Sequence, residues 1–203
     1  MRAWGWAQRA AAAVLLLPAA AVAVPVGVLI RLASPGPILI RQVREGRGGV
    51  RFSMYKLRTM VADGEARLEA CLAADPALRE EWSRYGRLAG DPRVAGRVAR
   101  FARRFSIDEL PQILNVLQGE MNLVGPRPLP VEVAAGMAPG DRRRRQAVLP
   151  GMTGLWQVSG RSELGIAEMG RLDRLYLRRR SVSRDLAILL RTTCAVLGGK
   201  GAY

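Results

Sequence analysis

An uncharged, apolar stretch near the amino terminus constrains this chain more than any other feature. It runs from Ala10 to Ile30 between Arg9 and Arg31, and Pro18 and Pro25 lie within it. A straight helix of this length would measure about 31 Å, close to the thickness of the hydrocarbon core of a membrane. Since each proline removes a helical hydrogen bond, we expect this helix to bend.

The charges beside this stretch favour a re-entrant helix, which enters one leaflet of a membrane and returns. Arg2 and Arg9 precede the stretch, and several arginines follow Arg31. Positive flanks prefer the cytoplasmic side, so both ends are expected on the same face. Three alternatives stay open: a plain span, a buried core helix, and a signal peptide cleaved after the residues 21–23. The arginines that follow soon afterwards disfavour export.

Composition narrows the chemistry that the rest of the chain can perform. Thirty-two basic residues against 17 acidic ones give a net charge of +15, which favours nucleic acid, anionic lipid or phosphorylated substrates as partners. The absence of histidine removes Ser–His and Cys–His pairs and most zinc sites. Cys71 and Cys194 are far apart and indicate no disulfide framework. Carboxylates, lysine, arginine and tyrosine are left for catalysis.

The pattern after the apolar stretch predicts a second, globular part. The sequence Ser34-Pro35-Gly36-Pro37 cannot continue a helix, so we expect residues 1–33 to form the anchor and residues 34–203 a separate domain. Residues 38–43 and 50–57, joined by a glycine-rich turn, predict a β-hairpin with Val50, Phe52 and Met54 on one face. Residues 60–88 look helical with an interruption at Pro76.

Two carboxy-terminal segments, 164–177 and 186–197, alternate apolar residues with arginines. Such basic amphipathic helices are typical of membrane interfaces, although ordinary surface helices of a basic protein have the same pattern. The arginine run 142–145 is expected to be solvated. Neither an RNA-binding aromatic pattern nor finger-type metal spacing is present, so nucleic acid is not expected as a partner. The predicted fold class is α+β: a mostly helical, membrane-anchored domain with a small β-hairpin and C-terminal amphipathic helices.

The segment Ser106-Ile107-Asp108-Glu109 places two adjacent carboxylates at the start of an expected helix that stops at Gly119. One interpretation is structural, because Ser106 with Glu109 fits a capping box and Asp108 could cap a helix instead. The other is functional. Arginines lie one turn upstream, and a helix amino terminus attracts phosphate and stabilises an ionised carboxylate.

The functional interpretation has a definite chemistry. Asp108 would attack phosphorus to form an acyl phosphate, while Glu109 would hold a metal ion or move a proton. Because both reactants would be polyanionic, Mg²⁺ is expected to bridge phosphates at Asp108 and Glu109. The chain has no D-x-D motif of the kind found in many nucleotide-sugar glycosyltransferases, which counts against direct sugar transfer to a hydroxyl.

Over nearly its whole length the chain resembles the bacterial sugar transferase family, the monotopic polyprenol-phosphate phosphoglycosyl transferases. The resemblance rests on ordered motifs rather than on composition. They are Ser34-Pro35-Gly36-Pro37 with Arg41-Gln42, Tyr55-Lys56-Leu57-Arg58-Thr59-Met60, Ser106-Ile107-Asp108-Glu109-Leu110-Pro111-Gln112, Val124-Gly125-Pro126-Arg127-Pro128, Pro150-Gly151-Met152-Thr153-Gly154 with Gln157, Gly160 and Arg161, and Gly199-Lys200-Gly201-Ala202-Tyr203.

The resemblance implies a reaction in which Asp108 attacks a UDP-sugar, UMP is released, and undecaprenyl phosphate collects the phosphosugar. This would initiate synthesis of an exopolysaccharide, capsule, O-antigen or glycoprotein glycan at the cytosolic face of the bacterial cytoplasmic (inner) membrane. Phospholipid would be a further partner, and a homodimer is possible. The resemblance implies that Asp108 and Glu109 are the catalytic pair. It implies that Arg103, Arg127 and Lys56 contact phosphate, and that Gln157 and Arg161 contact the substrate. In the anchor, it implies that Arg9 lies at the membrane surface and that Pro25 breaks the helix.

One departure from the family pattern lies at the start of the anchor. Family members often read Lys-Arg-x-x-Asp there, whereas this chain has Gln8-Arg9-Ala10-Ala11-Ala12. This difference changes the charges expected to position the helix in the membrane, but it does not change the chemistry expected of Asp108. The alternative to an enzyme is a basic protein that binds anionic lipid or nucleic acid without catalysis.

Overall fold

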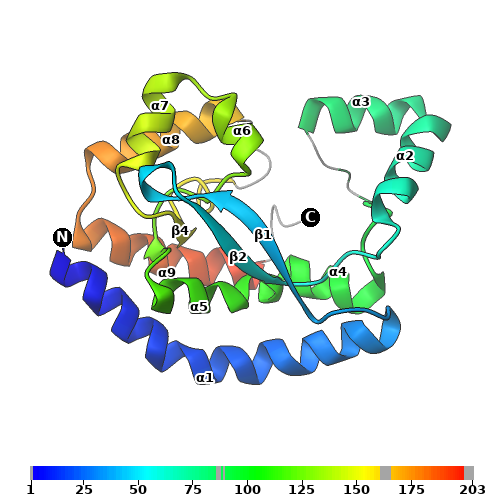
Figure 1. Ribbon diagram of the computed structural model, residues 1–203, viewed down its shortest axis with the longest axis horizontal. Helices are drawn as coiled ribbons and strands as arrows, with labels where there is room; N and C mark the ends of the chain where they lie inside the picture. Colours follow the sequence, from blue (N-terminus) through cyan, green and yellow to red (C-terminus); the bar gives the residue numbers. More distant parts are fainter. Residues whose placement is uncertain (1, 86–87, 89, 161–165, 199–203) are drawn as a thin grey trace.

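A long amino-terminal helix, α1 (Arg2–Ala33), underlies the rest of the molecule. The computed structural model describes residues 2–85, 88, 90–160 and 166–198. Pro18 and Pro25 both lie inside α1, and the helix is bent rather than straight (Figure 1). The predicted bend is therefore confirmed. The interruption expected at Pro25 does not occur, since the helix continues through it.

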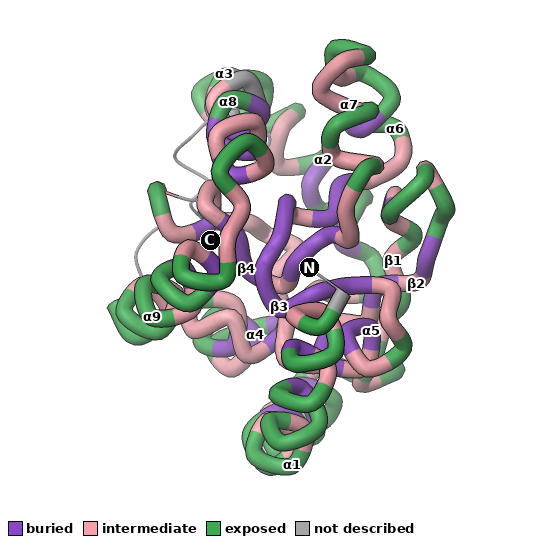
Figure 2. Tube along the Cα trace, turned by 90° about the vertical axis from the view of Figure 1, so that its left-hand side faces the viewer, coloured by how far each residue is buried: buried purple, intermediate pink, exposed green. Residues whose placement is uncertain are grey.

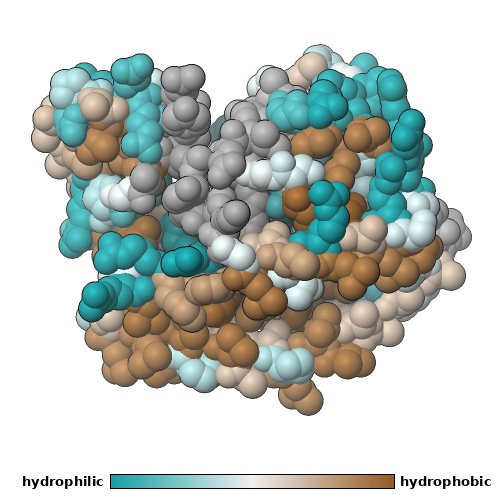
Figure 3. All heavy atoms as spheres, turned by 180° about the vertical axis from the view of Figure 1, so that it is seen from behind, coloured by the Kyte–Doolittle hydropathy of each residue, from teal (hydrophilic) through white to brown (hydrophobic). Residues whose placement is uncertain are grey.

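One side of α1 packs against the domain, and the other is exposed and apolar. Ala12 and Ile30 are fully buried, whereas Val14, Leu17 and Leu32 are more than three-quarters exposed. Hydrophobic atoms gather along the edge of the molecule where α1 lies (Figure 3). Of the described helices, only α1 is long and apolar enough to cross a membrane, and just 17% of its most apolar window is buried. It is not the buried core helix considered above.

Hydrogen bonds tie the first turns of α1 to distant parts of the chain. The indole Nε1 of Trp4 donates to Asp185 at 2.7 Å, and Gln8 Oε1 accepts a hydrogen bond from the backbone N–H of Val124 at 3.1 Å. Gln8 is buried, so the residue at which the chain departs from the family pattern has a structural role. Cleavage near Ala23 would remove both contacts, which argues against a signal peptide.

The predicted β-hairpin is present. Strands β1 (Leu39–Glu45) and β2 (Arg51–Leu57) pair antiparallel and are joined by a short 3₁₀ turn, η1 (Arg47–Gly49). Phe52 and Met54 share a buried face, as expected. The expectation for Val50 is wrong: it lies between the turn and β2 and is 67% exposed.

Three helices follow, and Pro76 divides the first two as predicted. They are α2 (Gly64–Ala74), α3 (Pro76–Tyr85) and α4 (Gly96–Arg104). Asp75 stands between α2 and α3, and its Oδ1 accepts a hydrogen bond from the N–H of Ala77 at 2.8 Å. The proline at the first position of α3 has no N–H to satisfy, so this start is favourable. In Figure 1, α2 and α3 extend away from the remaining elements.

A 3₁₀ turn and a short helix hold the hairpin in place. They are η2 (Ile107–Gln112) and α5 (Ile113–Gln118), and α5 ends at Gly119 in a left-handed conformation. The fully buried Asn115 side chain accepts from the N–H of Tyr55 at 3.1 Å and donates to the Ser53 carbonyl at 2.8 Å. These bonds attach β2 to α5, and they bring Lys56 beside η2.

A second pair of strands is parallel, and glycine residues allow its flanking backbones to approach closely. Strands β3 (Asn122–Val124) and β4 (Gly151–Thr153) are separated in sequence by α6 (Val131–Ala135) and α7 (Pro139–Gln146). A Cβ atom on Gly151 would lie 2.0 Å from the backbone nitrogen of Gly125. The two backbones can approach this closely only because both residues are glycine.

The two predicted carboxy-terminal helices are confirmed as α8 (Ile166–Arg178) and α9 (Val182–Gly198). They are joined by the buried Asp185, which accepts from the Tyr176 hydroxyl at 2.7 Å and also from Trp4. Figure 2 shows the buried centre at β3 and β4, with exposed outer sides on α1 and α9. The described chain is thus mostly helical with two small sheets. Binding of α8 and α9 to a membrane interface, and the domain boundary at residue 33, stay predictions.

The glycine contact generates a stability prediction. Gly151→Ala should lower the free energy of unfolding by roughly 1–3 kcal/mol, because the new methyl group must displace backbone rather than a flexible side chain. Urea unfolding followed by circular dichroism would measure the change. Gly136→Ala is the control, since its Cβ would meet nothing closer than 3.7 Å. Equal stability of the two variants would contradict the prediction.

Candidate active site

One cavity of about 460 Å³ brings together every predicted substrate or catalytic residue that the structure describes. The hairpin, η2, the segment after β4 and α9 enclose it. The predicted residues that line it are Lys56, Arg103, Asp108, Glu109, Arg127 and Gln157. Arg161 lies outside the described residues. Arg9 and Pro25 lie on α1 and do not line this cavity.

A sharp backbone turn sets the direction of the carboxylate pair. Ser106 has a φ of 53°, and it is the one non-glycine residue in the described part of the chain with a positive φ. Its carbonyl accepts the N–H of Glu109 at 3.1 Å, but its side chain makes no capping bond to η2. The capping-box interpretation is therefore wrong. The left-handed turn ends α4 and turns η2 toward the hairpin, which leaves the Asp108 side chain available for Lys56.

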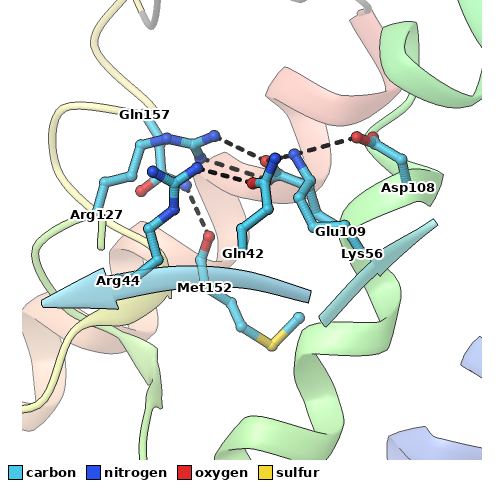
Figure 4. A network of polar contacts seen from close by, with 8 residues as sticks. All are labelled: Gln42, Arg44, Lys56, Asp108, Glu109, Arg127, Met152 and Gln157. Carbon is cyan, nitrogen blue, oxygen red and sulfur yellow. Dashed lines mark hydrogen bonds and ion pairs between the residues drawn. The ribbon is translucent and has the colours of Figure 1, made fainter. Parts of the chain in front are cut away.

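A chain of charges connects both carboxylates to the hairpin. Lys56 Nζ lies 3.2 Å from Asp108 Oδ2 and 3.2 Å from Glu109 Oε1. Arg127 Nη2 lies 2.8 Å from the same Glu109 oxygen (Figure 4). The Asp108 side chain is only 8% exposed, so its charge depends on Lys56 rather than on bulk water. Each of the four groups thus has an oppositely charged neighbour.

The surroundings push the two carboxyl pKa values in opposite directions. Burial raises the pKa of Asp108; the charge of Lys56 opposes this rise, and that of Glu109 adds to it. Burial alone would also raise the pKa of Glu109, but Arg127 and Lys56 outweigh it and hold that pKa well below its usual range. Such separation gives adjacent acids different roles. Glu109 stays ionised, whereas Asp108 is the more basic carboxylate and the better candidate nucleophile.

An internal ion pair positions Arg127. Arg145, on α7, donates to the main-chain carbonyl of Arg127 and pairs with Asp173 on α8. The Arg145 side chain is 10% exposed, and burial lowers its pKa to about 10. Arg142 likewise pairs with Glu45 at 2.5 Å. The expectation that the arginine run is solvated is wrong for Arg145, because α7 packs against α8, whereas the Arg142 side chain stays 35% exposed.

Several lining residues were not predicted from the sequence. Ile40, Gln42 and Arg44 alternate along β1 and all line the cavity. Arg44 donates to Gln42 Oε1 at 2.7 Å, and burial lowers the pKa of its guanidinium. This alternation of a strand is visible in the sequence and could have indicated them. Trp156, from the loop after β4, was also not predicted, and no pattern in the sequence indicates that it lines the cavity.

Within the part of the chain that the structure describes, three buried polar atoms around the cavity have no hydrogen-bond partner. They are the Nε of Arg44, the Nε1 of Trp156 and the Oε1 of Gln157, whose own amide nitrogen donates to the Met152 carbonyl at 2.7 Å. Buried polar groups normally find a partner, so an unsatisfied set of donors and an acceptor is typical of a ligand site. These atoms are available to a polar substrate.

The carboxylate pair fits a magnesium ion only in combination with substrate. In the described part of the chain, no three His, Cys, Asp or Glu residues cluster as a metal site. Mg²⁺ is commonly held by one or two carboxylates together with phosphate oxygens, and Asp108 and Glu109 can supply the protein's share. The residues present therefore fit a metal that arrives with a phosphorylated ligand.

Comparison with known proteins places the chain in a family. The family model described as bacterial sugar transferase matches residues 5–199. The chain belongs to the bacterial sugar transferase family. The match extends from the first turns of α1 to the end of α9, so it includes both the apolar helix and the cavity described above.

Three relatives show the kinds of protein to which the chain is similar. Undecaprenyl-phosphate galactose phosphotransferase of Salmonella typhimurium is 42% identical over 168 residues, which are 83% of this chain and 35% of that protein. UDP-glucose:undecaprenyl-phosphate glucose-1-phosphate transferase of Caulobacter vibrioides is 42% identical over 182 residues, 86% of this chain and 62% of that protein. Exopolysaccharide production protein ExoY of Sinorhizobium fredii is 38% identical over 178 residues, 86% and 76% respectively. The chain spans about a third of the length of the Salmonella protein.

The charge chain generates a prediction about Asp108. Lys56→Met should raise the pKa of the Asp108 carboxyl further, because it removes the positive charge that opposes the effect of burial. Carbon-13 NMR titration of aspartate side chains, assigned with Asp108→Asn, would measure it. Arg51→Met, an exposed arginine on the same strand, should leave the titration unchanged. A pKa that stays constant or falls in Lys56→Met would contradict the assignment.

A second prediction concerns the buried pair on α7 and α8. Arg145→Met should lower the free energy of unfolding by about 3–5 kcal/mol, since it leaves Asp173 buried without its partner. Denaturant unfolding would measure this loss. Arg143→Met, an exposed position on the same helix, should change stability by less than about 0.5 kcal/mol. Replacing Asp173 by leucine as well should restore part of the stability.

Proposed function

We propose that this protein is a membrane-associated sugar-1-phosphate transferase. In this proposal it moves a phosphosugar from a UDP-sugar to undecaprenyl phosphate through a covalent intermediate on Asp108, and it releases UMP. The observation that carries the proposal is a buried aspartate whose pKa is raised, held by a lysine inside a cationic cavity. The names of the relatives support the substrate classes.

The charges of the cavity suit a diphosphate. Among the described residues, four cationic side chains line it, Arg44, Lys56, Arg103 and Arg127, against the two carboxylates of Asp108 and Glu109. The surplus of two positive charges matches the charge of a bridging diphosphate in a nucleotide sugar. Arginine is suited to this task because its planar guanidinium donates two parallel hydrogen bonds to phosphate oxygens.

The reaction needs two displacements at one phosphorus atom. An oxygen of the ionised Asp108 attacks the phosphorus that bears the sugar, and the bond from that phosphorus to the bridging oxygen breaks. UMP leaves with the electron pair of this bond. An oxygen of undecaprenyl phosphate then attacks the same phosphorus and displaces the Asp108 carboxylate, which returns to its starting form. No proton or oxidant is consumed.

The neighbouring residues prepare Asp108 for attack. The ammonium of Lys56 favours the ionised form of Asp108. It can also stabilise the negative charge that develops on the departing phosphate. Glu109, kept ionised by Arg127 and Lys56, fixes both cations in position. Mg²⁺ would be held by Asp108 or Glu109 together with the diphosphate, where it would neutralise phosphate charge.

The membrane would supply the acceptor. The exposed apolar side of α1 and the outer side of α9 suit a lipid environment, and the acceptor named for two of the relatives is a lipid phosphate. We place the protein at the bacterial cytoplasmic membrane with its cavity on the cytosolic side, where UDP-sugars are found. The homodimer and the lack of nucleic-acid binding stay predictions.

Replacing the nucleophile tests the proposal. Asp108→Asn keeps the size of the side chain but removes its charge, so transfer should fall at least about 10³-fold. Release of UMP from a panel of UDP-sugars, with undecaprenyl phosphate and Mg²⁺, is the measurement. Asp63→Asn, at an exposed aspartate that pairs with Arg67, is the matched control and should keep its activity.

A covalent adduct distinguishes this mechanism from direct transfer. With donor alone, the tryptic peptide spanning residues 105–142 should gain the mass of the phosphosugar, and the gain should disappear in Asp108→Asn. Full turnover in Asp108→Asn would contradict the role of this residue. Salt-dependent DNA binding without UMP release from any donor would favour the non-enzymatic alternative.

A further inference from the structure

A second cavity, of about 410 Å³, lies beside the first turns of α1, and none of the described residues lines both it and the reaction cavity. It is bounded by α1, the hairpin turn η1 and the segment that precedes β4. Three arginines, Arg9, Arg47 and Arg180, line it together with Trp6, and none of the described lining residues is a carboxylate. Asn122 lines this cavity while the next residue, Leu123, lines the reaction cavity, so β3 separates the two.

The three arginines have hydrogen-bonding capacity left over. In the described part of the chain none of them forms an ion pair with a carboxylate, although most buried carboxylates elsewhere have one. The Nε atom of Arg180 is buried and has no hydrogen-bond partner. Arg9 lies over the ring of Trp6 at 4.9 Å from the centroid, which fixes the direction of its guanidinium. The guanidinium of Arg180 also donates to the Tyr176 hydroxyl, so its Nε is the part left for a ligand. Guanidinium groups that face no carboxylate are suited to a phosphate group.

The position of the cavity favours a lipid as the source of that phosphate. Arg9 marks the end of the apolar stretch of α1, and Trp6 beside it is 69% exposed. Tryptophan and arginine at the end of an apolar helix are typical of the headgroup region of a membrane. The exposed apolar side of α1 continues from this point, so a lipid could place its phosphate in the cavity and its acyl chains along the helix. A free phosphate would bind in the cavity but would make no use of the exposed apolar side of α1.

We propose that this second cavity binds the phosphate of an anionic phospholipid headgroup through Arg9, Arg47 and Arg180. The proposal rests on the membrane association included in the proposed function. The lipid site goes beyond the proposed function, since it is separate from the reaction cavity and binds a resident lipid rather than a substrate. Its consequence is a selective preference of the protein for anionic membranes.

Flotation of the full-length protein with vesicles tests the site. The vesicles are phosphatidylcholine with or without phosphatidylglycerol, and the double variant Arg47→Gln/Arg180→Gln is compared with Arg79→Gln/Arg143→Gln. The control removes the same charge from exposed positions on α3 and α7, which lie away from α1 (Figure 1). Partition onto phosphatidylglycerol vesicles should fall about 25-fold in the first variant, since each of the two arginines near an anionic surface contributes about a fivefold factor.

Further readouts separate this site from folding and from the proposed function. Binding to pure phosphatidylcholine and UMP release in detergent should be the same in the two double variants. Arg47→Gln alone, at an exposed residue of the turn, should give part of the effect without disturbing Arg180. An absence of UMP release in the wild type would overturn the proposed function while leaving the flotation difference intact.

Two outcomes would overturn the lipid site. Equal losses in both double variants would mean that overall charge, rather than this cavity, attracts the membrane. Displacement of the protein from phosphatidylglycerol vesicles by inorganic phosphate at equal phosphate concentration would assign the cavity to a soluble anion.

Discussion

The ammonium of Lys56 between two adjacent carboxylates is the interaction on which the rest of the site depends. Two negative charges on neighbouring residues repel one another, and burial in a cavity wall makes the repulsion more costly. Lys56 offsets it from the hairpin, and Arg127 offsets it from the loop after β3. The charge chain therefore requires that β2, η2 and this loop meet at one place. The Asn115 hydrogen bonds and the contact between Gly125 and Gly151 make that meeting possible.

The basic composition has more than one physical role in this fold. Part of the positive charge is paired with acidic residues: Arg142 pairs with Glu45 and the buried Arg145 pairs with Asp173, and these pairs hold α7 against the hairpin turn and α8. Another part lines the reaction cavity, where it exceeds the charge of the two carboxylates. A net charge of +15 alone could not distinguish these roles. The distinction depends on which arginines find an acidic partner.

The sequence predicted those features that depend on local pattern. The bounds of the apolar helix, the hairpin, the division at Pro76 and the two terminal helices follow from periodicity and from proline and glycine. The site residues were predicted from the functional interpretation of Asp108 and Glu109 and from the family resemblance. The left-handed turn at Ser106 and the pairing of Arg145 with Asp173 were missed, because they depend on how distant segments pack. Arg44 was missed although the alternation along β1 was visible.

The short strand β3 explains why two cationic cavities can have different roles. Its three residues are all buried, and the alternation of a strand sends the side chains of Asn122 and Leu123 to opposite sides. Arginines line the cavities on both sides, but among the described lining residues carboxylates occur only on the side of Leu123. A cavity without a nucleophile can bind a phosphate but cannot exchange its substituents. In the proposed function, the position of Asp108 and Glu109, rather than the distribution of arginines, therefore decides which of the two cavities carries out phosphoryl transfer.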